Sequence, residues 1–212
     1  MKIEAVIFDM DGALIFTPAE YRQLVVRATL KDYNRTATDV DIEDFWFLDE
    51  DRRREVIRTK FDLEPDIFIS AFVKHNTPEF RKQYTKPYDD AQIALEELRQ
   101  KGIKTGILTA APREMIEIEL PMLYPHKFDS VVRAQLSEGL RPKPAPDGLF
   151  RCLDELQVSR EEAIYVGDGK SDMETSQAAR VYGVWINREE YDFGKVPADL
   201  TITSLDALSI IS

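Results

Sequence analysis

The 212-residue sequence predicts an α/β fold: a doubly wound parallel sheet with helices on both faces, and an α-helical unit inserted after the first strand. Two observations carry this prediction. From about residue 87 onward, short apolar runs alternate with amphipathic helical patterns, which is typical of parallel strands joined by helices. Between the first apolar run and about residue 84, only helical patterns occur. We therefore divide the chain into a core, residues 1–16 and 85–212, and an insert, residues 17–84.

Composition narrows the class of protein. The chain is 43% hydrophobic, enough to bury a core, and has no apolar run near the ~18 residues of a membrane span. A formal net charge of −11 disfavours non-specific binding to nucleic acid or to an anionic membrane surface. Cys152 is the single cysteine, and its apolar neighbours predict a buried side chain. Without a signal-peptide pattern, we expect a cytoplasmic protein, monomeric or homodimeric.

The first strand is expected at Ala5–Phe8, an apolar run that ends at two carboxylates, Asp9 and Asp11, followed by Gly12. Alternate side chains at a strand end point the same way, so both acids can face one small volume. Carboxylate and carbonyl oxygens suit Mg²⁺, and an ionised carboxylate can attack phosphorus while its neighbour moves a proton. The alternative is a strand that runs into an ordinary Asp/Gly turn.

The remaining elements follow from apolar spacing and capping residues. Thr17-Pro18 is expected to open the insert, as a cap and a first-turn proline. Helices are expected over 17–28, 43–47, 49–60, 65–75, 91–101, 112–120, 146–156 and 168–179, with Pro121 closing the sixth. Strands are expected over 103–108, 128–132, 163–167, 183–186 and, at an edge, 200–202. Ser159 is expected to begin a capping box, and Ser204 to cap a last helix that buries Leu205, Leu208 and Ile211.

Two further strand ends carry residues suited to an anion. The second strand ends at Thr109 and Ala110, a hydroxyl and backbone N–H groups ahead of a helix, where anions are favoured. The alternative is a threonine that caps the helix begun by Pro112. Further on, the prolines of Arg141–Pro146 stiffen the chain and hold Lys143 in one place, where it can offset the charge of a phosphate. The alternative is a rigid surface loop with a solvated lysine.

A fourth strand end, at Tyr165–Gly167, carries two more acids. Asp168 leaves the strand, and Asp172 follows four residues later at the same helix N-terminus. Either could be a simple N-cap. Crowded carboxylates repel one another unless a cation joins them, however, and ligands of such sheets bind at the carboxyl ends of strands.

These four segments resemble, in order and spacing, the four motifs of the haloacid dehalogenase-like hydrolase superfamily. The matching residues are Asp9–Gly12, Leu108–Thr109, Lys143–Pro144 and Gly167–Asp172. The chain is similar to the phosphoglycolate phosphatase and β-phosphoglucomutase-like branch, which has a Rossmann-like core and a helical cap domain after the first motif. The resemblance spans essentially the whole chain, with residues 17–84 in the place of the cap.

The resemblance implies a Mg²⁺-dependent phosphatase that acts on a small phosphorylated metabolite. It implies that Asp9 is the nucleophile that forms an aspartyl-phosphate. Asp11 would protonate the leaving oxygen and then activate water. The phosphoryl group would be bound by Thr109, the Ala110 amide and Lys143. The metal ligands would be Asp9, the Asp11 carbonyl, Asp168 and, in support, Asp172. Closure of the cap would exclude water.

Two other functions stay open at this point. One is a phosphomutase, because Thr17–Tyr21 faintly resembles mutase sequences with a shift of one residue; the other is a non-catalytic, regulatory member of the family. The chain also departs from the family pattern at three places. Ala13 replaces a usual threonine, Phe16-Thr17 replaces a frequent Asp-Ser or Asp-Thr pair, and Arg180 stands where glycine is common.

Overall fold

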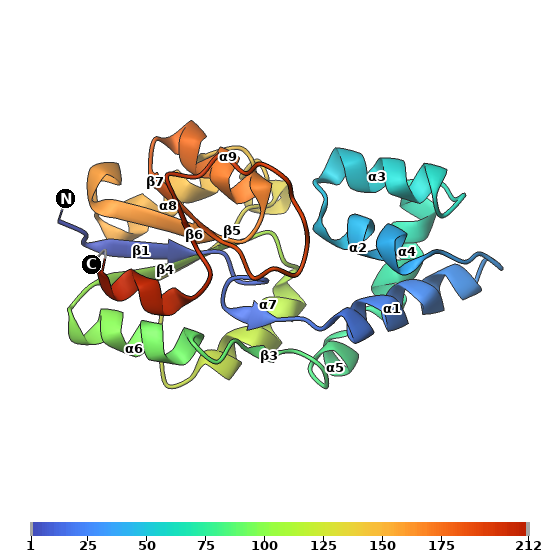
Figure 1. The fold of residues 1–212 in the computed structure, drawn as a ribbon, viewed down its shortest axis with the longest axis horizontal. Helices are drawn as coiled ribbons and strands as arrows, with labels where there is room; N and C mark the ends of the chain where they lie inside the picture. Colours follow the sequence, from blue (N-terminus) through green and yellow to red (C-terminus); the bar gives the residue numbers. More distant parts are fainter. Residues whose placement is uncertain (1, 211–212) are drawn as a thin grey trace. The chain divides into compact units, whose positions relative to one another are not determined.

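The computed structural model describes residues 2–210, and the larger part of the chain is built on a six-stranded parallel sheet (Figure 1). Its strands are β1 (Ala5–Phe8), β4 (Lys104–Thr109), β5 (Ser130–Arg133), β6 (Ala163–Gly167), β7 (Tyr182–Ile186) and β8 (Leu200–Ile202). They lie in the order β5-β4-β1-β6-β7-β8. The chain winds outward from β1 to β5, then returns to the other side of β1, so the winding reverses there. This confirms the predicted doubly wound sheet. Ligands of such sheets bind where the winding reverses, so a site is expected at the carboxyl end of β1.

The two central strands are apolar because the sheet is covered on both faces. Every residue of β1 and β6 is buried. Side chains alternate between the faces: Val6 and Phe8 belong to one apolar cluster, whereas Ala5 and Ile7 belong to another. Continuous apolar runs are therefore what a parallel sheet of this kind requires.

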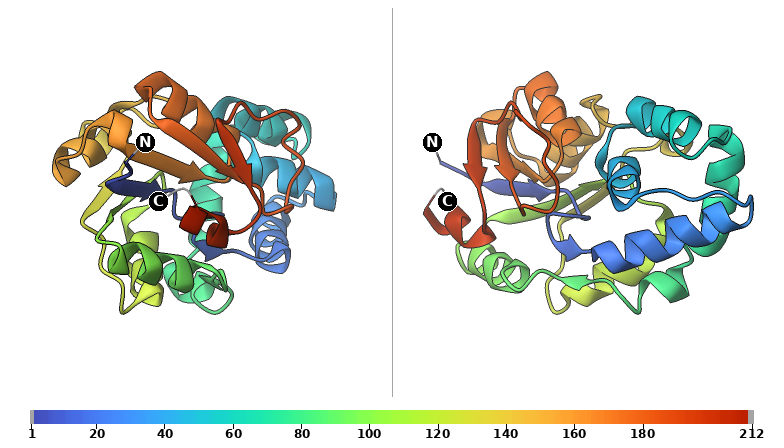
Figure 2. Two further views of the ribbon diagram at one scale, coloured as in Figure 1. Left: turned by 60° about the vertical axis from the view of Figure 1, so that its left-hand side comes forward. Right: turned by 45° about the vertical axis from the view of Figure 1, so that its right-hand side comes forward.

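Helices form a layer on each face of this sheet (Figures 1 and 2). They are α6 (Ala91–Gln100), α7 (Arg113–Glu119), α8 (Asp147–Leu156) and α9 (Lys170–Ala179). The apolar side of α6 joins the cluster of Val6 and Phe8, together with the 3₁₀ turn η4 (Leu205–Ile210). The apolar sides of α8 and the end of α9 join the cluster on the opposite face. No helix that the structure describes is long and apolar enough to cross a membrane.

The chain divides into two compact units, a larger one (Met1–Phe16 with Lys86–Ser212) and a smaller one (Thr17–Thr85). The smaller unit consists of α1 (Ala19–Lys31), α2 (Asp39–Phe47), α3 (Glu50–Thr59), α4 (Pro65–His75) and α5 (Pro78–Arg81). At its centre the rings of Phe45, Phe61 and Phe68 pack with centroids 5.0–5.7 Å apart. In the larger unit, two short strands, β2 (Ile15–Phe16) and β3 (Lys86–Pro87), pair antiparallel.

Several predicted boundaries are wrong, and a capping box explains one of them. The helix expected over 43–47 begins at Asp39, because Thr38 and Asp41 form a capping box. Thr17 does not cap α1: Pro18 holds the N-cap position, and no side chain caps the helix. The third large strand lies at Ser130–Arg133 rather than 128–132.

Three further expectations change in the 3₁₀ turns. Ser159 forms no capping box: its side chain accepts no bond from the backbone of the turn, and its hydroxyl donates to the Glu162 carboxylate at 2.7 Å. Pro121 lies inside the 3₁₀ turn η1 (Leu120–Leu123) that follows α7. Ser204 accepts a bond from the Asp206 N–H as expected, but the element after it is the 3₁₀ turn η4. Ile211 lies outside the described residues.

Candidate active site

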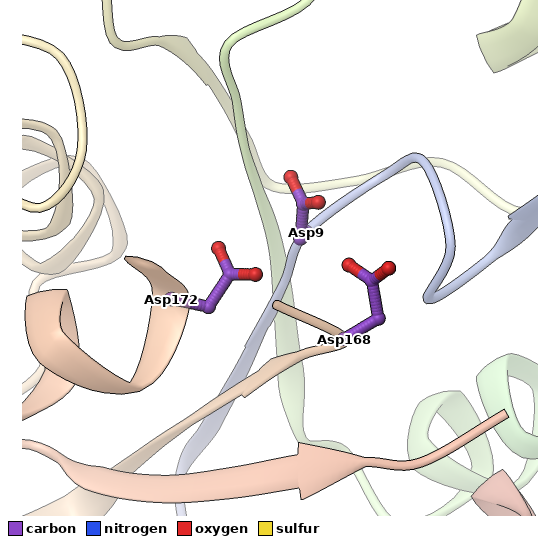
Figure 3. Close-up of side chains that lie close together, drawn as sticks. All are labelled: Asp9, Asp168 and Asp172. Atoms are coloured by element: carbon purple, nitrogen blue, oxygen red, sulfur yellow. The ribbon is translucent and has the colours of Figure 1, made fainter. Parts of the chain in front are cut away.

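Three aspartates from two neighbouring strand ends converge at the carboxyl edge of the sheet (Figure 3). Asp9 follows β1, Asp168 follows β6, and Asp172 lies in the first turn of α9. Each offers a carboxylate oxygen, and these three oxygens lie within 4.8 Å of one another. The strand register brings the acids together, because Phe8 pairs with Val166 and the Asp9 N–H donates to the Val166 carbonyl at 2.8 Å.

Lys143 reaches the same cluster from the proline-rich loop before α8. Its Nζ donates to Asp9 Oδ1 at 3.0 Å and to Asp172 Oδ1 at 2.6 Å. Its side chain is only 9% exposed. The alternative of a solvated surface lysine is therefore wrong, and the stiff loop holds a buried cation between two acids.

Burial and mutual repulsion shape the charges of this cluster. Burial raises the pKa of Asp9 to about 7, although the Lys143 ammonium opposes this, and the charges of Asp172 and Asp11 add to it. Burial, with the charges of Asp172 and Asp9, also raises the pKa of Asp168 well above its usual range. Burial lowers the pKa of Lys143, but the two acids outweigh it and raise that pKa.

One ammonium group cannot balance three carboxylates, of which Asp9 and Asp172 are buried and Asp168 is half-buried. A divalent cation with a preference for hard oxygen ligands fits this donor set, because it would supply the missing positive charge and accept an oxygen from each aspartate. The cluster is therefore chemically suited to a metal ion.

Two glycines allow the backbone to approach the acids closely. Gly12 has φ +76°, and a Cβ on it would lie 2.0 Å from Asp168 Oδ2. A Cβ on Gly167 would lie 2.4 Å from the Cβ of Asp172. From the sequence, Gly12 indicates no more than a turn after the two acids. Its closeness to Asp168 shows that it also shapes the site.

Sequence reasoning missed Tyr165. Its hydroxyl donates to Asp172 Oδ1 at 2.7 Å, and Lys143 Nζ approaches the same hydroxyl oxygen at 3.5 Å. Burial, followed by the charges of Asp172 and Asp9, raises the pKa of Tyr165, so it stays a donor. One signal was available: a tyrosine in a fully buried strand needs a partner for its hydroxyl.

The other predicted residues lie at the same edge of the sheet, with less defined contacts. Thr109 ends β4 and is buried, and its Oγ1 accepts a bond from the Ala111 N–H at 3.0 Å. This contact lies in the loop before α7 and does not cap that helix, whose N-cap is Pro112 with no side-chain bond, so the capping alternative is wrong. Ala110 is exposed, and its carbonyl accepts a bond from Gln135 at 2.6 Å. Asp11 is half-buried, and among the described residues its carboxylate is not part of the converging group. Their proposed roles stay predictions.

Comparison with known proteins identifies the family. The pyrophosphatase PpaX of Bacillus cereus (strain G9842) is 28% identical over 190 residues, 84% of this chain and 81% of that protein. A phosphoglycolate phosphatase of Colwellia psychrerythraea is 26% identical over 209 residues, 91% of this chain and 87% of that protein. A solved structure described as a HAD family hydrolase from Deinococcus radiodurans, with bound phosphate and sodium, has the same fold. Its TM-score is 0.74 at 19% identity, and the match covers 97% of this chain and 93% of that chain.

The family model described as haloacid dehalogenase-like hydrolase matches residues 6–186, a span that contains nearly all of β1, every strand through β7 and all four residues of the buried cluster. The chain therefore belongs to the haloacid dehalogenase-like hydrolase family.

Proposed function

We propose that the chain is a Mg²⁺-dependent phosphatase that hydrolyses a small phosphorylated metabolite, phosphoglycolate-like or a sugar phosphate. The observation that carries this proposal is the convergence of Asp9, Asp168 and Asp172 with Lys143 in one buried cluster. The names of the relatives, a phosphoglycolate phosphatase and a pyrophosphatase, support phosphorus as the centre of the chemistry. Asp9 is the proposed nucleophile, because it ends the central strand and lies beside the buried ammonium.

The proposed reaction has two steps. An Asp9 carboxylate oxygen bonds to phosphorus and the ester P–O bond breaks, which leaves an aspartyl-phosphate, while Asp11 gives a proton to the departing oxygen. Asp11 then takes a proton from water, whose oxygen attacks the phosphorus and returns Asp9 as a carboxylate. Lys143 keeps Asp9 oriented during both steps, and the Lys143 charge favours the ionised form of that carboxyl.

The remaining groups are proposed to bind the phosphoryl group and to neutralise its negative charge. Thr109 and the Ala110 N–H are proposed to hold oxygens of the phosphoryl group at the end of β4. A Mg²⁺ ion held by Asp9, Asp168 and the Asp11 carbonyl, with Asp172 in support, would remove the repulsion between the nucleophile and the phosphate. We further propose that the smaller unit acts as a cap domain that excludes water, and that the protein is cytoplasmic.

A panel of substrates tests the proposal. Phosphoglycolate, glucose phosphates, inorganic pyrophosphate and 4-nitrophenyl phosphate are incubated with the protein in Mg²⁺ or in EDTA, and phosphate release is measured. We expect turnover that needs Mg²⁺ and that is abolished by Asp9→Asn, while Asp154→Asn on the exposed side of α8 behaves as wild type. Retained Mg²⁺-dependent turnover in Asp9→Asn would refute the nucleophile.

The panel also separates the alternatives. A preference for pyrophosphate would agree with the relative of that name; its phosphate leaving group needs less help from an acid than an alkoxide does. Slow hydrolysis of the phosphoenzyme, with phosphate moving between sugar hydroxyls, would favour a mutase. Release from no substrate would favour a regulatory protein.

A further inference from the structure

The turn between β1 and β2 carries Asp11, and a residue distant in the sequence hydrogen-bonds to the backbone of this turn. Arg188, on the connection after β7, donates through Nη2 to the Ala13 carbonyl at 2.7 Å. Ala13 is fully buried, and 175 residues separate it from Arg188 in sequence. The turn that carries the proposed acid is thus hydrogen-bonded by a residue from the C-terminal part of the chain.

Arg188 is itself held in one orientation. Its two terminal nitrogens donate to the two carboxylate oxygens of Asp90 at 2.7 and 3.0 Å. The guanidinium carbon lies 3.8 Å from the centroid of the Tyr88 ring. Side-chain exposures are 10% for Arg188 and 13% for Asp90, so the pair is largely desolvated. A buried ion pair is weak evidence for stability, but a two-pronged one fixes geometry.

Tyr88 holds the next residue of the turn. Its N–H donates to the Leu14 carbonyl at 3.0 Å, and its ring packs against Phe16 with centroids 5.5 Å apart. The Tyr88 hydroxyl bonds to Glu190, two residues beyond Arg188. Consecutive carbonyls of the turn are therefore anchored by two residues whose side chains stack on each other.

On the other side, the turn is fixed by the aspartate cluster, because Gly12 lies directly against the carboxylate of Asp168. Within the turn, the Gly12 N–H donates to the Ile15 carbonyl at 2.9 Å. Asp11 comes immediately before these anchored residues, so their positions set the place of its backbone. A proton donor must lie within hydrogen-bond reach of the oxygen that it serves, and a small displacement costs rate.

We propose that Arg188 is a positioning residue that, through the Ala13 carbonyl, holds Asp11 where it can protonate the leaving oxygen. The inference rests on the proposed phosphatase function and on the acid role of Asp11. It also explains why alanine is tolerated where the family usually has threonine, since the contact uses the backbone of residue 13.

The leaving group provides the test. An alkoxide needs a proton as the P–O bond breaks, whereas the 4-nitrophenolate ion leaves without one. In Arg188→Gln, kcat/KM for the best alkyl phosphate of the panel should fall about tenfold or more, since general acids typically contribute about 10²–10⁴-fold. The value for 4-nitrophenyl phosphate should stay nearly unchanged. Because kcat/KM reports only the steps up to departure of the leaving group, hydrolysis of the phosphoenzyme does not enter.

Two further variants serve as a control and as a conservative substitution. Arg151→Gln, which removes an exposed pair with Glu155, should leave both rates at the wild-type value. Arg188→Lys keeps the charge beside Asp90 but lacks the planar fork that also reaches Ala13, so it should show a smaller loss with the same selectivity. It replaces Arg188→Gln if circular dichroism shows that variant to be unfolded.

The outcomes separate the two hypotheses. Equal losses on both substrates, or no loss on either, would overturn the positioning role of Arg188 while leaving the phosphatase intact. If the wild-type protein hydrolyses no alkyl or aryl phosphate, the proposed function itself is wrong, and the role of Arg188 falls with it.

Discussion

Two constraints favour glycine at position 12: its positive φ angle and its close approach to Asp168. Its φ of +76° costs a residue with a Cβ about 1 kcal/mol, and the added Cβ would meet Asp168 Oδ2 at 2.0 Å. We predict that Gly12→Ala lowers the free energy of unfolding and, by displacing Asp168, also weakens the binding of Mg²⁺. Urea unfolding and a calorimetric Mg²⁺ titration measure the two effects separately.

Gly139 provides a matched control for this substitution. It has φ +74°, but nothing lies within 4 Å of a Cβ built on it. Gly139→Ala should therefore carry the backbone cost alone and leave the affinity for Mg²⁺ unchanged. Equal affinities in the two variants would show that the contact with Asp168 has no influence on the metal site.

His126 gives a pH dependence away from the site. Its Nε2 bonds to Thr105 Oγ1 at 2.8 Å, and its ring packs edge-on against Phe128. Burial lowers the pKa of His126, with a smaller contribution from Arg99, although Asp129 and Glu96 oppose this. The unfolded chain therefore takes up the proton first, and stability is lost as pH falls below about 6.5.

The substitution His126→Gln should remove this part of the acid sensitivity. Urea unfolding from roughly pH 5 to 7.5 should show a smaller decline in the free energy of unfolding for the variant than for wild type. The same decline in both proteins would mean that His126 takes up its proton equally easily in the folded and unfolded chains.

At the scale of an element, aromatic packing holds α4 against the other helices of the smaller unit. Phe68 is fully buried, with ring centroids 5.1 Å from Phe45 and 5.0 Å from Phe61. Phe68→Ala should lower the free energy of unfolding by about 3–5 kcal/mol. Ile67→Ala, on the exposed side of the same helix, should cost less than about 1 kcal/mol. Similar losses in urea unfolding would contradict this account of the unit's core.

The long elements could be predicted because each carries its own pattern. The apolar runs of β1 and β6, with the turn residues that follow them, are enough to predict that Asp9 and Asp168 lie at the ends of buried strands. The two-residue strands β2 and β3 have too few residues for a period to be seen, and they exist because Ile15 pairs with Pro87 across the chain. The shortness of these two strands, rather than their composition, prevents their prediction from the sequence.

The missed contacts of the site depend on residues far apart in sequence. Tyr165 looks like any core tyrosine until α9 places Asp172 beside its hydroxyl. Arg188 looks like a surface cation until the fold places it over Tyr88 and against Ala13. Arg180 has a local explanation: it adopts φ +58° at the end of α9, a conformation that glycine adopts without strain.

At the scale of the whole molecule, both the chain and its candidate site carry an excess of negative charge. The formal net charge is −11, and within that total the cluster has three carboxyl groups against one Lys143 ammonium. Such an arrangement repels an anionic substrate unless a cation is bound. Stability and metal binding are therefore linked, and a single substitution can change both in opposite directions.

Asp168→Asn tests this linkage. Burial and the charges of Asp172 and Asp9 raise the pKa of Asp168, so its ionised form is disfavoured in the folded protein at neutral pH. In EDTA the neutral asparagine should raise the free energy of unfolding above that of wild type. In Mg²⁺ at 100 times its Kd, wild type should gain about 2.7 kcal/mol, and the variant much less. The order of stability should thus reverse between EDTA and Mg²⁺ in urea unfolding, whereas Asp154→Asn should follow wild type in both. An equal gain from Mg²⁺ in wild type and Asp168→Asn would mean that the ion binds elsewhere.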